Sequence, residues 1–422
     1  MTIRVVDADE DPAADALLMQ IFLDPAGRAN PYPCYQQLRE RAPVLRSSMG
    51  SVVLSRYEDC LAVLGDPRFG RGVALRGEST GYVPYGDLDS EPELRSRYYE
   101  AAGPAMLFTD PPLHSRLRRL VSRAFTANRV RALRSTVEQM VDELLDEALE
   151  RKEVELMGEV ALPLPIRVIG ELVGVPESDR SALQPLVRAA KGGIEPVATP
   201  DELRAAADAV TALNSYFTEL FEERERRPAD DLLSALVAAR EADDQLTSEE
   251  IAATAWLLFA AGYETTASLI GSGTLALIEH PDQQFRWRQH PGIGPMAIEE
   301  LLRWDSPVQV NPRIAMVPVE VLGIQLEPGD SVLALQGAAN RDPDRFADPE
   351  TLDLTREDNQ PLSFGWGAHH CLGAPLARME GEILLTRLLQ RCSEVVGLDE
   401  APAWRGDMTV RGLAYLHVRL GS

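Results

Sequence analysis

One cysteine of the chain stands in a setting that favours chemistry. Cys371 lies in the segment FGWGAHHCLGAPLARME, between Gly367 and Gly373. Pro375 is a residue type that commonly opens a helix, so we expect Cys371 just before a helix N-terminus. Backbone N–H groups at such an end favour a thiolate over a thiol. A thiolate presented on a glycine-rich loop can serve as a metal ligand or as a nucleophile.

Two other interpretations of this loop fail on spacing. The third glycine of a dinucleotide-binding G-x-G-x-x-G would fall on His370. A zinc site needs separated ligand pairs, whereas His369, His370 and Cys371 are adjacent, and the cysteines of the chain form no C-x-x-C. We therefore expect reduced, unpaired cysteines.

A second group of reactive side chains lies in a long apolar stretch. Helical spacing over 248–279 begins at a capping box of Thr247 and Glu250. Between Ile251 and Ile278 its only charge is Glu264, which is followed by Thr265. A membrane span is the rival interpretation, but an acid and an alcohol at the centre favour a helix buried in the core.

The centre of this stretch has the residue types that proton delivery requires. Ala261 and Thr265 are four residues apart and share a helix face. Gly262 has no side chain, so oxygen or water can approach the backbone, and the helix can open locally there. A carboxylate beside an alcohol can relay protons to a reacting group. We expect Glu264 and Thr265 to be catalytic.

Most of the remaining pattern is helical. Helical spacing covers 32–41, 112–126, 129–151, 201–226, 229–242, 295–303 and 375–391. Residues 43–57 predict a hairpin, and 319–335 predict a second strand pair. Residues 71–105 are expected to form a functional loop such as a lid, and 190–200 a break between helices. The predicted fold class is mainly α with small β-sheets.

Charge argues against two classes of partner. The chain has 422 residues, with 42 Lys and Arg against 66 Asp and Glu, a net charge of −24. Such a surface repels phosphate backbones, so we expect no nucleic-acid partner. The first residues are acidic and contain no cationic segment followed by an apolar run. We expect no secretory signal, no membrane association and a cytoplasmic location.

The cysteine segment resembles the haem-binding loop of the cytochrome P450 family in its soluble bacterial form. The match is F-G-x-G-x-H-x-C-L-G followed by A-x-L-A-R-x-E. Further family landmarks follow the right order along the chain, among them DPPLHSRLRRLVSRAFT, LLFAAGYETTASLIG, EELLRW and AANRDPDRFADP. The resemblance implies a single P450 domain over 1–422, with haem b between the long central helix and the cysteine-loop helix.

The resemblance also assigns residues. It implies that Cys371 is the axial thiolate ligand of the haem iron, that Phe364 shields this thiolate, and that Ala261 and Gly373 lie against the cofactor. It implies that the haem propionates are bound by His114, Arg118, Arg313 and His369. It gives Glu300, Arg303 and Arg356 a structural role near the cysteine loop. Substrate contacts are expected at Leu257, Leu258, Val310, Asn311, Met408 and Val410.

The implied activity is a haem-thiolate monooxygenase that inserts one atom of O2 into a small hydrophobic molecule, by hydroxylation or epoxidation in secondary metabolism. No flavin or nicotinamide motif is present. Electrons are therefore expected from NAD(P)H through an acidic ferredoxin that docks on the basic region 116–134. The alternatives are a catabolic, steroid or xenobiotic hydroxylase, an atypical member that couples its substrate oxidatively, and a non-catalytic haem sensor.

Overall fold

The computed structural model describes residues 5–72, 91–240 and 246–421. Its α-helices are α1 (Pro12–Leu23), α2 (Pro25–Ala29), α3 (Tyr32–Arg41), α4 (Tyr57–Gly65), α5 (Pro92–Ala102), α6 (Leu113–Ala124), α7 (Ala127–Ala132), α8 (Arg134–Arg151), α9 (Pro163–Val173), α10 (Glu177–Ala190), α11 (Pro200–Arg226), α12 (Leu232–Arg240), α13 (Ser248–Glu279), α14 (Pro281–Gln289), α15 (Gly294–Trp304), α16 (Gln336–Ala339) and α17 (Ala374–Arg391).

The strands are short and form small sheets. They are β1 (Val5–Asp7), β2 (Val44–Arg46), β3 (Val52–Leu54), β4 (Phe69–Gly70), β5 (Glu153–Glu155), β6 (Val310–Ala315), β7 (Val319–Val321), β8 (Ile324–Leu326), β9 (Ser331–Leu335), β10 (Val395–Gly397), β11 (Ala403–Trp404), β12 (Leu413–Tyr415) and β13 (His417–Leu420). The largest sheet has the order β1-β2-β3-β9-β6-β4. The predicted class, mainly α with small sheets, is confirmed.

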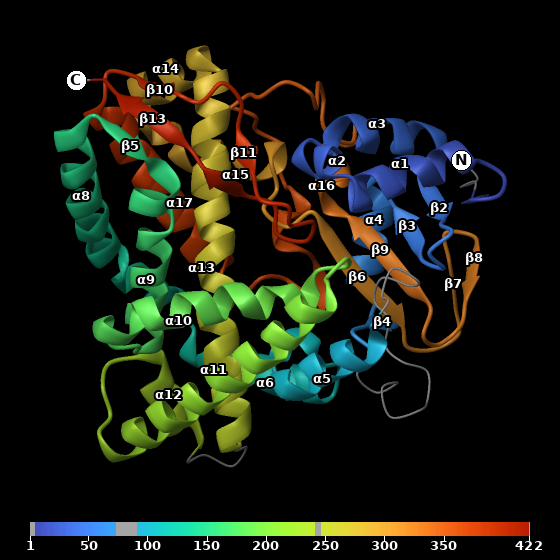
Figure 1. Cartoon of the computed structure of the whole chain (residues 1–422), viewed down its shortest axis with the longest axis horizontal. Helices are drawn as coiled ribbons and strands as arrows, with labels where there is room; N and C mark the ends of the chain where they lie inside the picture. The colour runs from blue at the N-terminus through green and yellow to red at the C-terminus, as the bar shows by residue number, and fades with distance from the viewer. Residues whose placement is uncertain (1–4, 73–90, 241–245, 422) are drawn as a thin grey trace.

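Helix α13 passes through the middle of the molecule, with α8 and α9 on one side and the largest sheet with α1 to α4 on the other (Figure 1). Thr247 and Glu250 form the predicted capping box at its start. Most of its side chains are buried, Glu264 among them. Among the described residues, none of the helices, α13 included, combines the length and hydropathy that crossing a bilayer requires.

Several predicted boundaries hold and some do not. Helices α3, α11 and α13 begin and end within one residue of the predicted ranges. The single helix predicted over 129–151 is wrong, because the chain leaves α7 at Leu133 and starts α8 at Arg134. Helices α1, α9 and α10 were not predicted. Their apolar faces are completed by packing, for example of α10 on α11 and of α9 on α13.

The expected loop 71–105 is partly a helix. Residues 73–90 lie outside the described ranges, but α5 covers Pro92–Ala102 and packs on α11. Tyr98 and Tyr99 are buried against Phe108, with ring centroids 5.9 and 5.2 Å from it. Helix α11 is about a hundred residues away in the sequence, so local composition could not signal the helix that packs on it. The predicted break at 190–200 is confirmed, with one 3₁₀ turn at Lys191–Ile194.

Candidate functional site

The loop that carries Cys371 is held by backbone contacts. The Cys371 N–H donates to the Phe364 carbonyl at 2.9 Å, which closes the loop on itself. Gly367 has a φ of 71°, and a Cβ there would collide with the Leu64 carbonyl at the end of α4. Only glycine satisfies both conditions. The sequence therefore sets the loop tightly against α4 and presents Cys371 just before α17.

Cys371 faces a cavity of about 370 Å³ inside the molecule. Ala261, Gly262 and Thr265 of α13 line the same cavity, together with Phe364 and Gly373. The cavity walls place the thiol and the centre of α13 on one continuous internal surface, as the predicted cofactor position requires. Ala261 is exposed and faces this cavity.

The protonation of Cys371 reflects competing influences. Burial raises the pKa of its thiol above the ordinary value, whereas the Gly373 and Ala374 N–H groups and the Arg118 guanidinium act to lower it. The N–H groups predicted at the start of α17 are therefore directed at the sulfur. A metal ion takes a thiolate and displaces the proton, so binding of iron would overcome the effect of burial.

The predicted propionate partners gather at one edge of the cavity. The rings of His114 and His369 lie 4.1 Å apart, and both line the cavity. Arg118 also lines it and donates from Nη2 to the His370 carbonyl at 2.8 Å. Arg313 is buried beside them but does not line the cavity, and its Nη1 donates to the Pro312 carbonyl at 3.0 Å.

Neutral histidine is the favoured form in this group. Burial, followed by the Arg118 charge, lowers the pKa of His114 to about 4. Burial and the charges of Arg71, Arg313 and His114 lower the pKa of His369 well below its usual range. Both pKa shifts have the same two causes, burial first and then the charges of the surrounding cations. Such a volume suits bound carboxylates.

At the centre of α13, the predicted acid and alcohol have different partners. Thr265 Oγ1 donates to the Ala261 carbonyl at 2.8 Å, one turn earlier. Helix α13 is continuous through this point. Glu264 is buried and lies 2.9 Å from Lys191 Nζ and 3.3 Å from Arg405 Nη1. The Lys191 and Arg405 side chains also contact Asp407, so the acid belongs to a charged cluster that joins α13 to the C-terminal segment.

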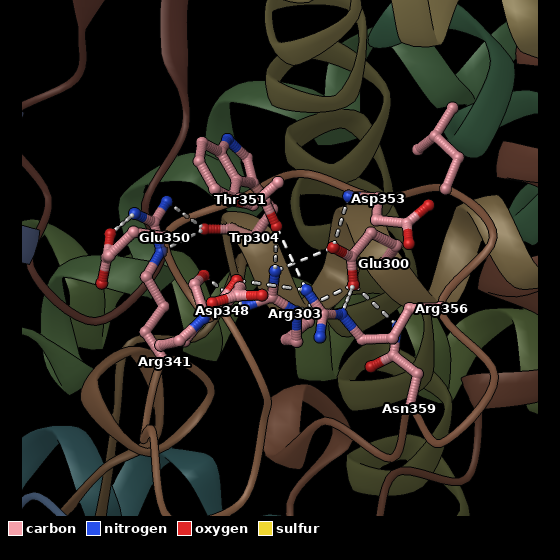
Figure 2. Close-up of polar contacts among 12 residues, drawn as sticks. Glu300, Arg303, Trp304, Arg341, Asp348, Glu350, Thr351, Asp353, Arg356 and Asn359 are labelled. Carbon is pink, nitrogen blue, oxygen red and sulfur yellow. Dashed lines mark hydrogen bonds and ion pairs between the residues drawn. The ribbon is translucent and has the colours of Figure 1, made fainter.

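The predicted structural residues form one network (Figure 2). Arg303 donates to both oxygens of Glu300 at 2.8 Å, and both side chains are fully buried. Arg356 Nε donates to Glu300 at 3.1 Å, and the Asp353 N–H and Asn359 amide donate to the same carboxylate. The structure thus brings Glu300, Arg303 and Arg356 together.

Five of the six predicted substrate residues line the cavity: Leu257, Leu258, Val310, Asn311 and Val410. Met408 does not. It is buried beside a separate small pocket lined by Arg28, Tyr35 and Gln309. The walls of the main cavity are predominantly apolar.

In the basic region 116–134, fewer arginines are available to a docking partner than its composition suggests. Arg116 pairs with Glu250, Arg129 with Asp230 at 3.2 Å, and Arg134 with Glu382 at 3.2 Å. Arg118 is turned inward to the cavity. The partners come from distant segments, so the local absence of acids does not translate into an equally basic surface. Arg123 is exposed and has no ion pair among the residues that the structure describes.

Sequence reasoning missed several side chains of the site. Arg71 lines the cavity, although local composition predicts the start of a loop there. Lys191 lines it from the predicted break between helices. Glu380 of α17 is a buried carboxyl at the cavity wall, and burial raises its pKa well above the ordinary value. Only Glu380 had a sequence signal, since it ends the A-x-L-A-R-x-E motif.

These residues fit haem b. A thiol faces the internal cavity, and histidine and arginine side chains at one edge suit the two carboxylates of the porphyrin. A Cβ on Gly373 would lie 3.9 Å from the Cys371 sulfur, so the glycine keeps the approach to the sulfur open. No group of three or more His, Cys, Asp or Glu that could hold a metal ion occurs in the described ranges.

Comparison with known proteins gives concordant results. Residues 196–290 and 294–402 match the sequence profile of the family described as cytochrome P450. The chain is 40% identical to cytochrome P450 107B1 of Saccharopolyspora erythraea, over 92% of this chain and 94% of that protein. It is 37% identical to 6-deoxyerythronolide B hydroxylase of the same organism, over 92% and 96%. The crystal structure of ligand-free CYP164A2 of Mycobacterium smegmatis has a TM-score of 0.86 and 35% identity, covering 96% of this chain and all of that one.

Proposed function

The chain belongs to the cytochrome P450 family, and on this premise we propose that it is a monooxygenase that tailors a polyketide-type secondary metabolite. Members of the family use haem and O2. The observation that carries the proposal is the cavity shared by Cys371, Ala261 and Thr265. It supplies a ligand for the iron and, from α13, the groups that deliver protons.

Cys371 would hold the haem iron through its sulfur, and Phe364, whose carbonyl accepts from the Cys371 N–H, lines the same cavity. Bound haem supplies the activation of O2, which a thiolate ligand favours by donating electron density. The Gly373 and Ala374 N–H groups stabilise negative charge on the sulfur. Arg378 lies 4.4 Å over the Phe364 ring and fixes the ring in place. His114, Arg118, Arg313 and His369 are assigned to the propionates.

Thr265 and Glu264 are assigned to proton delivery. The Thr265 hydroxyl lines the cavity and is oriented by its hydrogen bond to Ala261. Glu264 lines the cavity from the next position and is held by Lys191 and Arg405. Because Glu264 and Thr265 line the same cavity, the carboxyl group can relay protons toward the Thr265 hydroxyl.

The carbon-monoxide difference spectrum of the reduced protein tests the ligand assignment. A long-wavelength thiolate band is expected for the wild type. Cys371→Ser should lose this band, and Cys392→Ser, which changes a buried cysteine at the end of α17, should keep it. A thiolate band in Cys371→Ser, or a short-wavelength band in the wild type, contradicts the assignment. The latter result would favour a haem sensor.

The substrate proposal rests on the apolar cavity and on the relative named 6-deoxyerythronolide B hydroxylase. The test is the shift of the ferric haem spectrum on addition of 6-deoxyerythronolide B, compared with testosterone as a steroid. We expect a lower dissociation constant for the macrolactone than for the steroid, and a product that is heavier than the macrolactone by one oxygen atom. Tighter binding of the steroid would support the alternative of a steroid hydroxylase. A product without an added oxygen atom would support oxidative coupling.

For the electron donor, we propose an acidic ferredoxin reduced by NAD(P)H through a separate reductase. Arg123 is the docking cation best supported, because it is exposed and forms no described ion pair. Arg123→Glu should raise the KM for ferredoxin by about tenfold at low salt, with little change at high salt. Arg226→Glu makes the same charge change at an exposed position of α11 and should leave the KM for ferredoxin unchanged. Equal effects of the two variants contradict docking at Arg123.

A further inference from the structure

Arg71 is placed beside Arg313 by strand pairing. Strands β4 and β6 are antiparallel, with Phe69 opposite Ala315 and Gly70 opposite Ile314. The next position along this register sets Arg71 opposite Arg313. Like charges opposite each other on neighbouring strands destabilise a sheet unless something compensates for them. A bound anion would do so.

The backbone at Arg71 is fixed. The Arg71 N–H donates to Asp110 Oδ1 at 2.5 Å. A Cβ on Gly70 would collide with the same carboxylate, so Asp110 approaches closely only because residue 70 is glycine. Arg71 therefore leaves β4 in one direction, toward the cavity that it lines.

The Arg71 side chain is buried and has few partners of its own. It is 9% exposed. Its Nη1 donates to the Pro312 carbonyl at 3.2 Å, and its buried Nε has no hydrogen-bond partner. Within residues 5–72, 91–240 and 246–421, no carboxylate forms an ion pair with this guanidinium. Burying a guanidinium without a counterion is costly, so the arrangement indicates that an anion completes it.

The position of the charge indicates which anion. The Asp110 carboxylate accepts from the Arg71 N–H, and the Asp110 carbonyl accepts from the His114 N–H at 2.9 Å. Arg71, His114 and His369 all line the cavity, and the rings of the two histidines lie 4.1 Å apart. The Arg71 guanidinium therefore lies at the edge of the cavity where the two histidines meet. This is the edge assigned to the cofactor carboxylates.

We propose that Arg71 is a further haem-binding residue, whose guanidinium pairs with a propionate alongside His114, Arg118, Arg313 and His369. The proposal rests on the haem site proposed above. A guanidinium can bind a carboxylate through two parallel hydrogen bonds, which would use the unpaired Nε and a neighbouring nitrogen. Arg71 would also secure the end of β4 to the cofactor.

Two variants and a matched control test this role in the haem-loaded protein. Arg71→Met removes the charge and keeps the length, whereas Arg71→Lys keeps the charge and loses the paired donors. Arg68→Met removes an exposed arginine three residues away, which pairs with Asp66 at the surface. Haem loss is followed by transfer to excess apomyoglobin, and the propionate-bending bands by resonance Raman spectroscopy.

Arg71→Met should lose haem at least about tenfold faster than wild type and shift a propionate band, since one charge-assisted hydrogen bond is lost. The rate of haem loss from Arg71→Lys should lie between those of Arg71→Met and wild type. Arg68→Met should lose haem at the wild-type rate. Wild-type haem loss and unshifted propionate bands in both Arg71 variants overturn the proposal. Should Arg71→Met not fold, the Raman bands of Arg71→Lys decide.

Two further outcomes are separable. If haem retention is unchanged but the affinity for myristic acid falls, Arg71 serves a substrate carboxylate and the proposal is wrong. The carbon-monoxide spectrum of the same samples reports on Cys371 independently. A thiolate band with unchanged haem loss overturns only the Arg71 proposal, whereas a wild type without that band overturns the haem site and the Arg71 proposal with it.

Discussion

Lys191 Nζ lies 2.9 Å from Glu264 Oε2, where a turn between two helices meets the centre of α13. Both side chains are largely withdrawn from solvent, and Asp407 lies 2.5 Å from the same ammonium. The acid assigned to proton delivery is therefore part of the framework that joins α13, the segment after α10 and the C-terminal segment.

Replacing Lys191 should weaken that framework. Lys191→Met leaves two carboxylates with Arg405 and Arg188 as their nearest cations, so we expect a loss of about 2 kcal/mol in the free energy of unfolding. Urea unfolding of the haem-loaded protein measures it. Lys152→Met, at the exposed end of α8, is the control and should change stability by less than about 0.5 kcal/mol. Equal effects would mean that the cluster contributes nothing.

Removing the Thr265 hydroxyl should uncouple electron use from product formation. In Thr265→Ala the donor at the cavity wall is lost, so more of the NAD(P)H consumed should appear as hydrogen peroxide, and Thr265→Ser should restore much of the coupling. The ratio of peroxide to product is the measurement. Thr274→Ala removes an equivalent hydroxyl, which donates to Ile270 at 2.8 Å on the same helix, and should leave the ratio unchanged. Unchanged coupling in Thr265→Ala would assign proton delivery to Glu264 through water.

The Glu300 network should be costly to break. Arg303→Met leaves a fully buried carboxylate short of two donors, and we expect a loss of about 3–5 kcal/mol in unfolding free energy. Arg303→Lys should not restore it, because Nε, Nη1 and Nη2 each donate separately. Arg345→Met, which breaks a pair with the exposed Asp358, should cost about 1 kcal/mol or less. Comparable losses for Arg303 and Arg345 would contradict the assigned role.

Glu195 should make stability depend on pH. Burial, with the nearby Asp407 charge, raises the pKa of its carboxyl from 4.5 to about 7, although the Met408 and Thr409 N–H groups oppose this. Between these values the folded chain binds more protons than the unfolded chain, so the free energy of unfolding should fall as pH rises from about 4.5 to 7. The contribution of Glu195 to the free energy of unfolding is at most roughly 3 kcal/mol. The partial exposure of its side chain makes the contribution smaller than this limit.

Glu195→Gln isolates this contribution. The variant cannot ionise, so its free energy of unfolding should fall less steeply than that of wild type over this pH range. Glu202→Gln, at the exposed start of α11, should follow wild type. Parallel pH profiles for wild type and Glu195→Gln would show that the carboxyl does not titrate in this range.

Local sequence signals predict some of these features and miss others. The bounds of α13 and the partnership of Glu300 with Arg303 were predictable, since a capping box, helical period and i, i+3 spacing are local signals. The cations around Glu264 were not, because Arg405 is 141 positions away and nothing in either segment marks the contact. The position of Arg71 was not predictable either, because it depends on the register of β4 with β6. Composition alone misjudged the basic region, where distant acids neutralise local arginines.

The burial of Lys191 has a practical consequence. The chain has only one other lysine, Lys152, which is exposed where α8 ends. With the Lys191 ammonium held by Glu264 and Asp407, amine-reactive reagents should attach to side chains at Lys152 alone. Apart from the α-amine of the chain, coupling to an activated electrode or bead would therefore proceed through one side chain, without lysine mutagenesis.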